Sequence, residues 1–87
     1  MRPESSPSAA LVAELWDGSA LTEAKFGALA HASRRAVQDW KSGARKCPPA
    51  AFELLVMALV AHRYIAAGPW MSEWVRPEFM AFFRKAL

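Results

Sequence analysis

The sequence predicts an all-α protein: a small helical bundle of about five helices with an aromatic-rich helical extension at the C-terminus. Apolar residues recur at the spacing of one helix face, and residues that favour helix ends stand between these segments. The sequence shows no strand-like alternation of apolar and polar residues. With 87 residues, of which 54% are hydrophobic, the chain can build one core and is too short for two. We therefore expect a single domain over residues 1–87.

The N-terminal part is expected to contain an arm and one helix. Residues 1–8 are rich in Pro and Ser and predict a flexible arm. Ser8 is a good N-cap, so a first helix is expected over residues 9–16. The segment Asp17-Gly18-Ser19 is expected to break this helix, because its residues favour turns.

Two short helices are expected next, each with its own cap. Thr22 predicts the start of a helix over residues 23–30, and Ser33 the start of another over residues 34–41. Gly43 suits the left-handed position that ends such a helix. Because so few residues separate the two helices, they cannot pair as an antiparallel hairpin and must cross steeply.

The second half of the chain is more apolar. A fourth helix is expected over residues 50–67, and residues 54–61 within it are apolar on every side. A helix of that kind is expected to be buried all round. Gly68-Pro69 should end it. A short helical turn over residues 70–75 and a last helix over residues 78–86 then complete the predicted extension.

The basic residues are concentrated in one segment. The chain has a formal net charge of +3. Between Thr22 and Lys46 there are six basic and two acidic side chains, whereas the remainder of the chain has a small acidic excess. A basic excess confined to one block is typical of a nucleic-acid footprint.

Other classes of function find little support in the residues. Cys47 is the only cysteine, so a disulfide framework and a cysteine metal cluster are excluded, although nearby charges could lower its pKa. His62 has no acid or cysteine at ligand spacing, and His31 is expected in a turn. No catalytic motif is present, so we expect neither an enzyme nor a cofactor. The apolar runs are too short to span a membrane, and no signal-peptide-like apolar stretch follows the N-terminus, so we expect a cytoplasmic protein. Binding to nucleic acid would make it nucleoid-associated.

A longer motif accompanies the basic block. Residues 21–43 read LTEAKFGALAHASRRAVQDWKSG and are followed by Arg45 and Pro48. This pattern resembles the lambda-repressor-like (Xre/Cro) family of helix-turn-helix DNA-binding regulators. The resemblance covers about residues 9–67, roughly two thirds of the chain. It implies a helix-turn-helix core there, with residues 68–87 used for packing or dimerisation.

The resemblance assigns structural roles and shows two departures. Gly27 is the small residue where the two helices touch, and the crossing is sealed by Phe26, Ala30, Val37 and Trp40. The turn position that usually holds glycine is occupied by His31, a residue that tolerates positive φ. The usual acid before Ser-Gly is Lys41.

The resemblance also implies which residues contact DNA. The base-reading residues would be Ser33, Arg34, Arg35, Gln38 and Asp39. Arginine pairs with guanine O6 and N7, so at least one guanine is expected in each half-site. Because Arg35 and Asp39 are four residues apart on a helix, a surface ion pair between them is an equally good interpretation. The residues assigned to DNA phosphates are Glu23, Lys25, Lys41, Arg45 and Lys46.

The apolar second half predicts association. A single short recognition helix offers few base contacts, and a symmetric dimer would supply two. The expected dimer interface comprises Leu55, Leu59, Trp70, Trp74, Phe79 and Phe83. The function expected is a homodimeric repressor of its own small operon that binds an inverted repeat in double-stranded DNA. Regulators of phage or mobile-element type, including those of anti-CRISPR operons, fit this description.

Two alternatives stay open at this point. The chain could be the antitoxin of a toxin–antitoxin pair, with the aromatic C-terminus binding a protein toxin. It could also be a protein-interaction module without DNA binding. A third idea, that the aromatic residues stack on single-stranded bases, is less favoured because few basic residues lie among them.

Overall fold

The computed structural model describes the backbone of residues 6–86 and the side chains of residues 6–83. The fold is all-α, as predicted, and the described part of the chain contains no strand. Its α-helices are α1 (Ala9–Ser19), α2 (Glu23–Ala28), α3 (Arg34–Ser42), α4 (Pro49–Ala61) and α5 (Pro77–Met80). Two 3-10 helices, η1 (Pro69–Glu73) and η2 (Ala81–Ala86), flank α5. The predicted arm lies largely outside the described residues.

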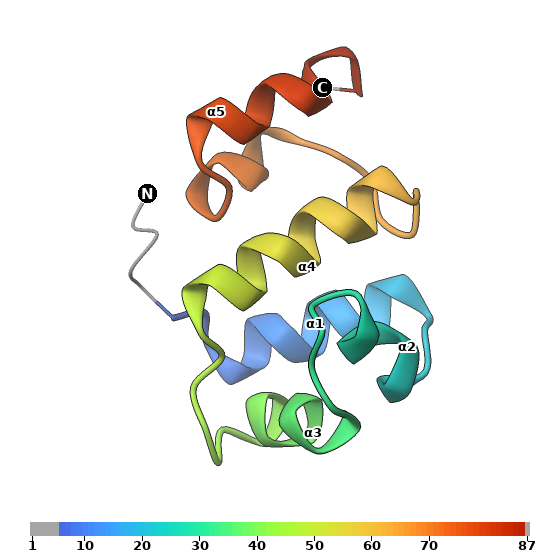
Figure 1. Cartoon of the computed structure of the whole chain (residues 1–87), viewed down its shortest axis with the longest axis vertical. Helices are drawn as coiled ribbons and strands as arrows, with labels where there is room; N and C mark the ends of the chain where they lie inside the picture. The colour runs from blue at the N-terminus through green and yellow to red at the C-terminus, as the bar shows by residue number, and fades with distance from the viewer. Residues whose placement is uncertain (1–5, 87) are drawn as a thin grey trace.

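Helix α4 lies at the centre of the molecule. In Figure 1 it runs between the group formed by α1, α2 and α3 and the C-terminal segment that contains α5. The molecule measures 34 × 25 × 20 Å along its principal axes. Helix α3 lies at one end of the long axis and α5 near the other, and α4 lies between them.

The predicted N-caps of the first three helices are present. The side chains of Ser8, Thr22 and Ser33 accept hydrogen bonds from the backbone N–H groups three residues later, at 3.1, 3.2 and 3.1 Å. Gly43 ends α3 with φ of 87°. His31 has φ of 54°, so it takes the left-handed turn position expected of it.

Helix α1 does not break where the sequence predicted. It continues through Asp17 and Gly18 to Ser19, and Ala20 ends it in the left-handed conformation. The Ser19 hydroxyl donates to the Trp16 carbonyl at 2.7 Å and accepts from the Leu21 N–H at 3.3 Å. These bonds satisfy the helix end, and one glycine inside a helix costs only about 1 kcal/mol.

Two other helix ends also differ from the prediction. Helix α2 ends at Ala28. The N–H groups of Ala30 and His31 donate to carbonyls three residues earlier, which forms the turn that contains His31. Helix α4 stops at Ala61 and does not reach residue 67. Arg63 adopts φ of 63°, and the N–H groups of Arg63 and Tyr64 donate to the carbonyls of Val60 and Leu59. This is a Schellman end without glycine, so composition did not reveal it.

The core is built around α4 and reaches both ends of the molecule. Val12, Phe26 and Val37 from the first three helices are fully buried, as are Met71 and Val75 from the extension. Trp74 packs edge-on against Phe52 of α4, with ring centroids 5.0 Å apart. The expectation that α4 is buried all round is wrong at Leu54, which is exposed because neither neighbouring group covers that side.

An ion pair attaches the extension to α4. Glu53 is buried, and its carboxylate accepts the backbone N–H of Arg76 at 2.8 Å and the Arg76 Nε–H at 3.1 Å. The hydrogen bonds that Arg76 donates to Glu53 raise the pKa of Arg76. A buried carboxylate needs such partners, since isolated charges are costly inside a protein. Sequence analysis missed this pair because its members lie 23 residues apart.

The contact between α2 and α3 generates the first testable prediction. A Cβ atom added at Gly27 would lie 2.8 Å from the Ala32 carbonyl oxygen and 2.9 Å from Val37 Cγ2. Gly27→Ala is therefore expected to force the helices apart and to lower the free energy of unfolding by about 1–3 kcal/mol. Urea denaturation of the two proteins measures this difference.

Gly18 supplies the matched control. A Cβ added there meets nothing within 4 Å, and the residue lies inside α1. Gly18→Ala should raise the free energy of unfolding by about 0.5–1 kcal/mol, because alanine is the better helix former. Equal effects of the two substitutions would contradict the tight crossing at Gly27.

Candidate nucleic-acid interface

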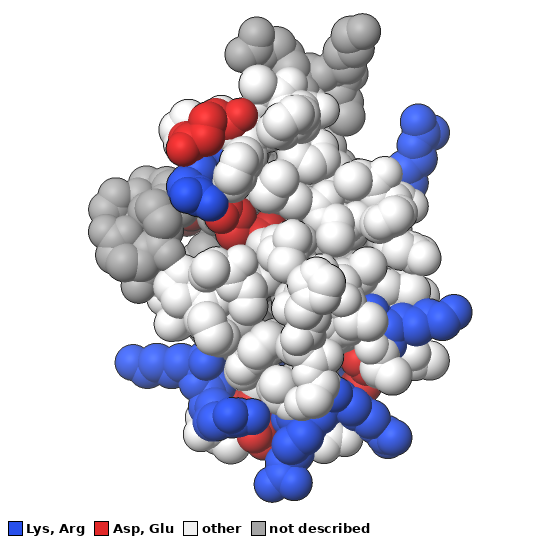
Figure 2. Space-filling model, in the orientation of Figure 1, with Lys and Arg blue, Asp and Glu red and all other residues white. Residues whose placement is uncertain are grey.

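Basic side chains gather at one end of the molecule. In Figure 2 the Lys and Arg side chains are concentrated around the end where Figure 1 places α3, whereas the face over α4 is largely uncharged. The side chains of Arg34 and Arg35 on α3 are 70% and 79% exposed. The basic block of the sequence therefore forms a localised surface, defined here as the basic end: Lys25, Arg34, Arg35, Arg45 and Lys46.

The packing of α3 explains why its arginines face outward. Val37 and Trp40 are buried against α1 and α2, so the opposite face of this helix must lie at the surface. That face carries Arg34, Arg35 and Gln38, all of them exposed. Ser33 is also exposed, although its hydroxyl oxygen is used in capping the helix. These four predicted base-reading residues therefore share one accessible face.

Glu23, at the start of α2, lies beneath three side chains of α3. Its Oε1 accepts from Arg34 Nε at 3.4 Å and from Gln38 Nε2 at 3.1 Å. Its Oε2 accepts from Lys41 Nζ at 2.8 Å. These hydrogen bonds, that from Lys41 first and that from Gln38 next, lower the pKa of Glu23 from its ordinary value of 4.5.

This geometry contradicts the assignment of Glu23 to DNA phosphates. Both carboxylate oxygens already accept hydrogen bonds from α3, and a carboxylate repels a phosphate. No local pattern predicts the cluster, because the three donors lie 11, 15 and 18 residues from Glu23 in the chain. Only the steep crossing of α2 and α3 brings them together.

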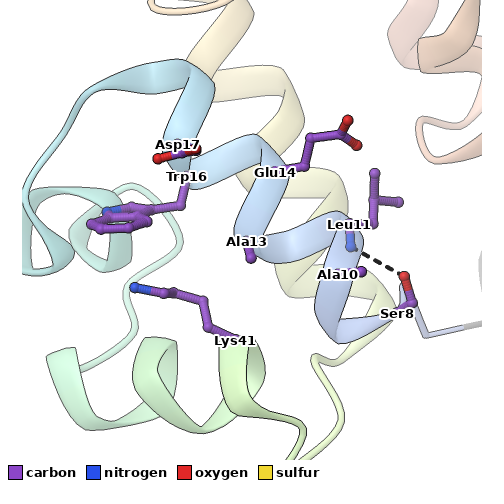
Figure 3. A pocket seen from close by; sticks show the side chains of 8 residues that line it. All are labelled: Ser8, Ala10, Leu11, Ala13, Glu14, Trp16, Asp17 and Lys41. Carbon is purple, nitrogen blue, oxygen red and sulfur yellow. Dashed lines mark hydrogen bonds between the residues drawn. The ribbon is translucent and has the colours of Figure 1, made fainter.

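Lys41 is also paired with Glu23 and is mostly covered. Its side chain is 19% exposed, and its ammonium lies 2.8 Å from Glu23 and 3.3 Å from the centroid of the Trp16 ring. Figure 3 shows the side chain extending from α3 toward Trp16 on α1. The ammonium already has an ion-pair partner and a cation–π contact, so this geometry does not favour the phosphate contact of Lys41, which stays a prediction.

Asp39 forms a second acidic centre on α3. Its Oδ1 accepts from Arg35 Nε at 3.4 Å, and its Oδ2 accepts from Arg45 Nε at 2.9 Å. The ion pair between Arg35 and Asp39, one of two interpretations of their spacing, is therefore present. With both oxygens engaged, Asp39 is placed to hold arginines and not to contact a base itself.

The predicted dimer interface divides into buried and accessible residues. Leu55 and Leu59 are 0% exposed, and Phe83 is also buried, so these three belong to the core of the single chain and the prediction is wrong for them. Trp74 and Phe79 are half-buried, and Trp70 is exposed. Among residues 6–83, the large apolar side chains at the surface are Leu54, Tyr64, Trp70 and Phe82.

The single cysteine and the two histidines differ in burial. Cys47 is buried, and burial raises the pKa of its thiol to about 12. The expectation that nearby charges could lower this pKa is wrong, because burial removes the hydration that a thiolate needs. His31 and His62 are exposed. Among the described residues, no group of His, Cys, Asp and Glu is arranged to hold a metal ion.

The lowered pKa of Glu23 predicts a pH effect on stability. A carboxyl group whose pKa is lower in the folded state stabilises the fold above its unfolded pKa, near 4.5, and this stabilisation is lost as the pH falls through the folded pKa. The melting temperature should therefore fall more steeply below pH 4.5 in the original protein than in Glu23→Gln. Thermal unfolding across a pH series measures both curves, and parallel curves would contradict the cluster.

Comparisons with known proteins identify no relative of this chain. No protein-family model, no curated protein and no solved structure matches this chain. Within residues 6–86, no helix is long and apolar enough to cross a membrane. The features that bear on function are therefore the exposed face of α3, the basic end that surrounds it and the two carboxylates beneath it.

Proposed function

We propose that this protein is a sequence-specific regulator that binds double-stranded DNA and reads its major groove with α3. One observation carries the proposal: Arg34, Arg35 and Gln38 are exposed together on one face of a capped helix that packs tightly on α2. A helix presented in this way fits the major groove, where base edges differ for every base pair. The resemblance of residues 21–43 to helix-turn-helix regulators supports the same conclusion.

The exposed side chains divide into those proposed to contact bases and those proposed to contact phosphates. Arg34 and Arg35 offer the donors that match guanine, and Gln38 offers the donor and acceptor that match adenine. Lys25, Arg45 and Lys46 are exposed around α3 and would contact phosphates on either side of the groove. Phosphate contacts supply affinity and register, whereas base contacts supply the sequence preference.

The regulator is proposed to act as a homodimer on an inverted repeat. One recognition helix of nine residues provides few base contacts, and a two-fold pair places two of them about 34 Å apart, one turn of DNA. The exposed Leu54 and Phe82 replace Leu55 and Leu59 as the apolar residues available for association. Bound at a promoter, the dimer would repress its own small operon, as phage and mobile-element regulators do. Light scattering that shows only monomer at micromolar concentration would contradict this part.

The antitoxin alternative rests on the aromatic C-terminus. Met71, Val75 and Phe83 are buried in the core, and Trp74 packs on Phe52, so most of this segment already has a partner within the chain. Trp70 and Phe82 are left at the surface for a second protein. Most of the exposed basic side chains among the described residues lie at the basic end, away from this segment, which favours DNA as the principal partner.

The arginine face supplies the test of the proposed function. The protein should enrich a defined motif, an inverted repeat containing guanine, from a pool of duplexes with randomised centres. The double substitution Arg34→Ala, Arg35→Ala should abolish the enrichment, because it removes the guanine donors and leaves the buried side of α3 intact. Arg63→Ala, which removes an exposed arginine outside the basic block, should leave the motif unchanged. An unchanged motif in the double variant would exclude α3 as the reading helix.

The salt dependence of DNA binding tests the proposed phosphate contacts. The logarithm of the binding constant should fall linearly with the logarithm of the salt concentration, and Lys46→Gln should reduce that slope by about one. Lys41→Gln should leave the slope nearly unchanged, because Lys41 is already paired with Glu23. Fluorescence anisotropy titrations at several salt concentrations measure both slopes. Equal reductions would show that Lys41 leaves Glu23 to reach a phosphate.

A further inference from the structure

We infer that Asp39 and Glu23 are positioning residues that set Arg35 and Arg34 to read guanine. This inference rests on the proposed function and deepens it. The observation behind it is that both arginines contact a carboxylate through Nε, the donor nearest the side-chain stem. The carboxylates thus hold the arginines from the side that faces the protein.

The chemistry of the guanidinium group gives this contact its meaning. A guanidinium has five N–H donors in one plane, of which one is on Nε and four are on the terminal nitrogens. When Nε faces a carboxylate, the two terminal nitrogens stay free at the outer edge of the group. Guanine presents two acceptors, O6 and N7, side by side in the major groove. The outer edge of a held arginine therefore matches a guanine.

The burial of the groups supports this orientation at Asp39. The side chain of Asp39 is 19% exposed, whereas that of Arg35 is 79% exposed. The carboxylate therefore lies close to the surface of α3, and most of the arginine projects beyond it. Arg45 contacts the second oxygen at 2.9 Å, which fixes the carboxylate from the other side.

Glu23 provides the same support to Arg34 and is itself held in place. Lys41 donates to its Oε2 at 2.8 Å, and the Lys41 ammonium is fixed in turn against the Trp16 ring. The other oxygen accepts from Arg34 and from one N–H of the Gln38 amide. The remaining N–H and the amide oxygen of Gln38 stay available for an adenine.

These carboxylates have opposite effects on affinity and on specificity. A negative charge next to the DNA repels the phosphates, so each carboxylate should weaken binding to every sequence. A held arginine has fewer conformations to lose on binding, which favours the base that matches its orientation. If these were simple surface ion pairs, which contribute little to stability, the carboxylates would still weaken binding to every sequence. They would not increase the preference for one base.

Selection from the randomised duplex pool, repeated with Asp39→Asn, tests the inference. The expected result is a loss of about tenfold in the preference for guanine at one position of each half-site, the range that one bidentate contact provides. Binding to a duplex of unrelated sequence should become no weaker. Asp39→Glu, which restores the carboxylate, should keep more of the preference than Asp39→Asn does. Asp17→Asn, the same change on the exposed side of α1, should leave the motif intact.

Glu23→Gln provides an independent second variant, in which the guanine preference should fall at a different position. If both variants select the original motif with undiminished preference, the inference is overturned and the proposed function stands. If the original protein enriches no motif, the proposed function fails, and the inference fails with it. Circular dichroism of each variant confirms that the helices are retained.

Discussion

The exposed arginine face depends on the close approach of α2 and α3 at Gly27. At this position the carbonyl oxygen of Ala32 and the side chain of Val37 leave no room for a Cβ atom. The approach lets Phe26 and Val37 bury completely, and that burial determines which side of α3 faces inward. It also brings Glu23 under Arg34, Gln38 and Lys41. One glycine therefore controls both the orientation of the helix and the electrostatic support beneath it.

The charges of the basic end are organised in two layers. Glu23 and Asp39 are mostly covered, with side chains 21% and 19% exposed, and basic side chains project beyond them. The inner layer gives the outer arginines ion-pair partners and reduces the net positive charge at this end of the molecule. Lys41 belongs to the inner layer despite its sign, because its ammonium is held between a carboxylate and an aromatic ring. The number of charges in the basic block does not show which of them are covered and which are exposed.

Helix α4 supplies much of the core that connects the two ends of this small chain. Its apolar residues belong to one core cluster with those of the first three helices and the C-terminal extension, so the extension completes the core that α1, α2 and α3 begin. The buried pair of Glu53 and Arg76 fixes where the extension returns to α4. Leu55 and Leu59 are buried in this core, whereas Leu54 and Phe82 lie at the surface.

The sequence by itself determined the helical class, the caps at Ser8, Thr22 and Ser33, the left-handed turn at His31 and the exposure of the arginines on α3. These features depend on residues a few positions apart, so local patterns predict them. Only the tertiary structure decided the longer α1, the early end of α4, the burial of Leu55 and Leu59 and the roles of Glu23, Lys41 and Asp39. Helix ends shift when packing or a local hydrogen bond compensates for weak propensity, and a side chain's partner across a helix crossing has no signature in the intervening sequence. The direction in which a charged group points is therefore a property of the fold.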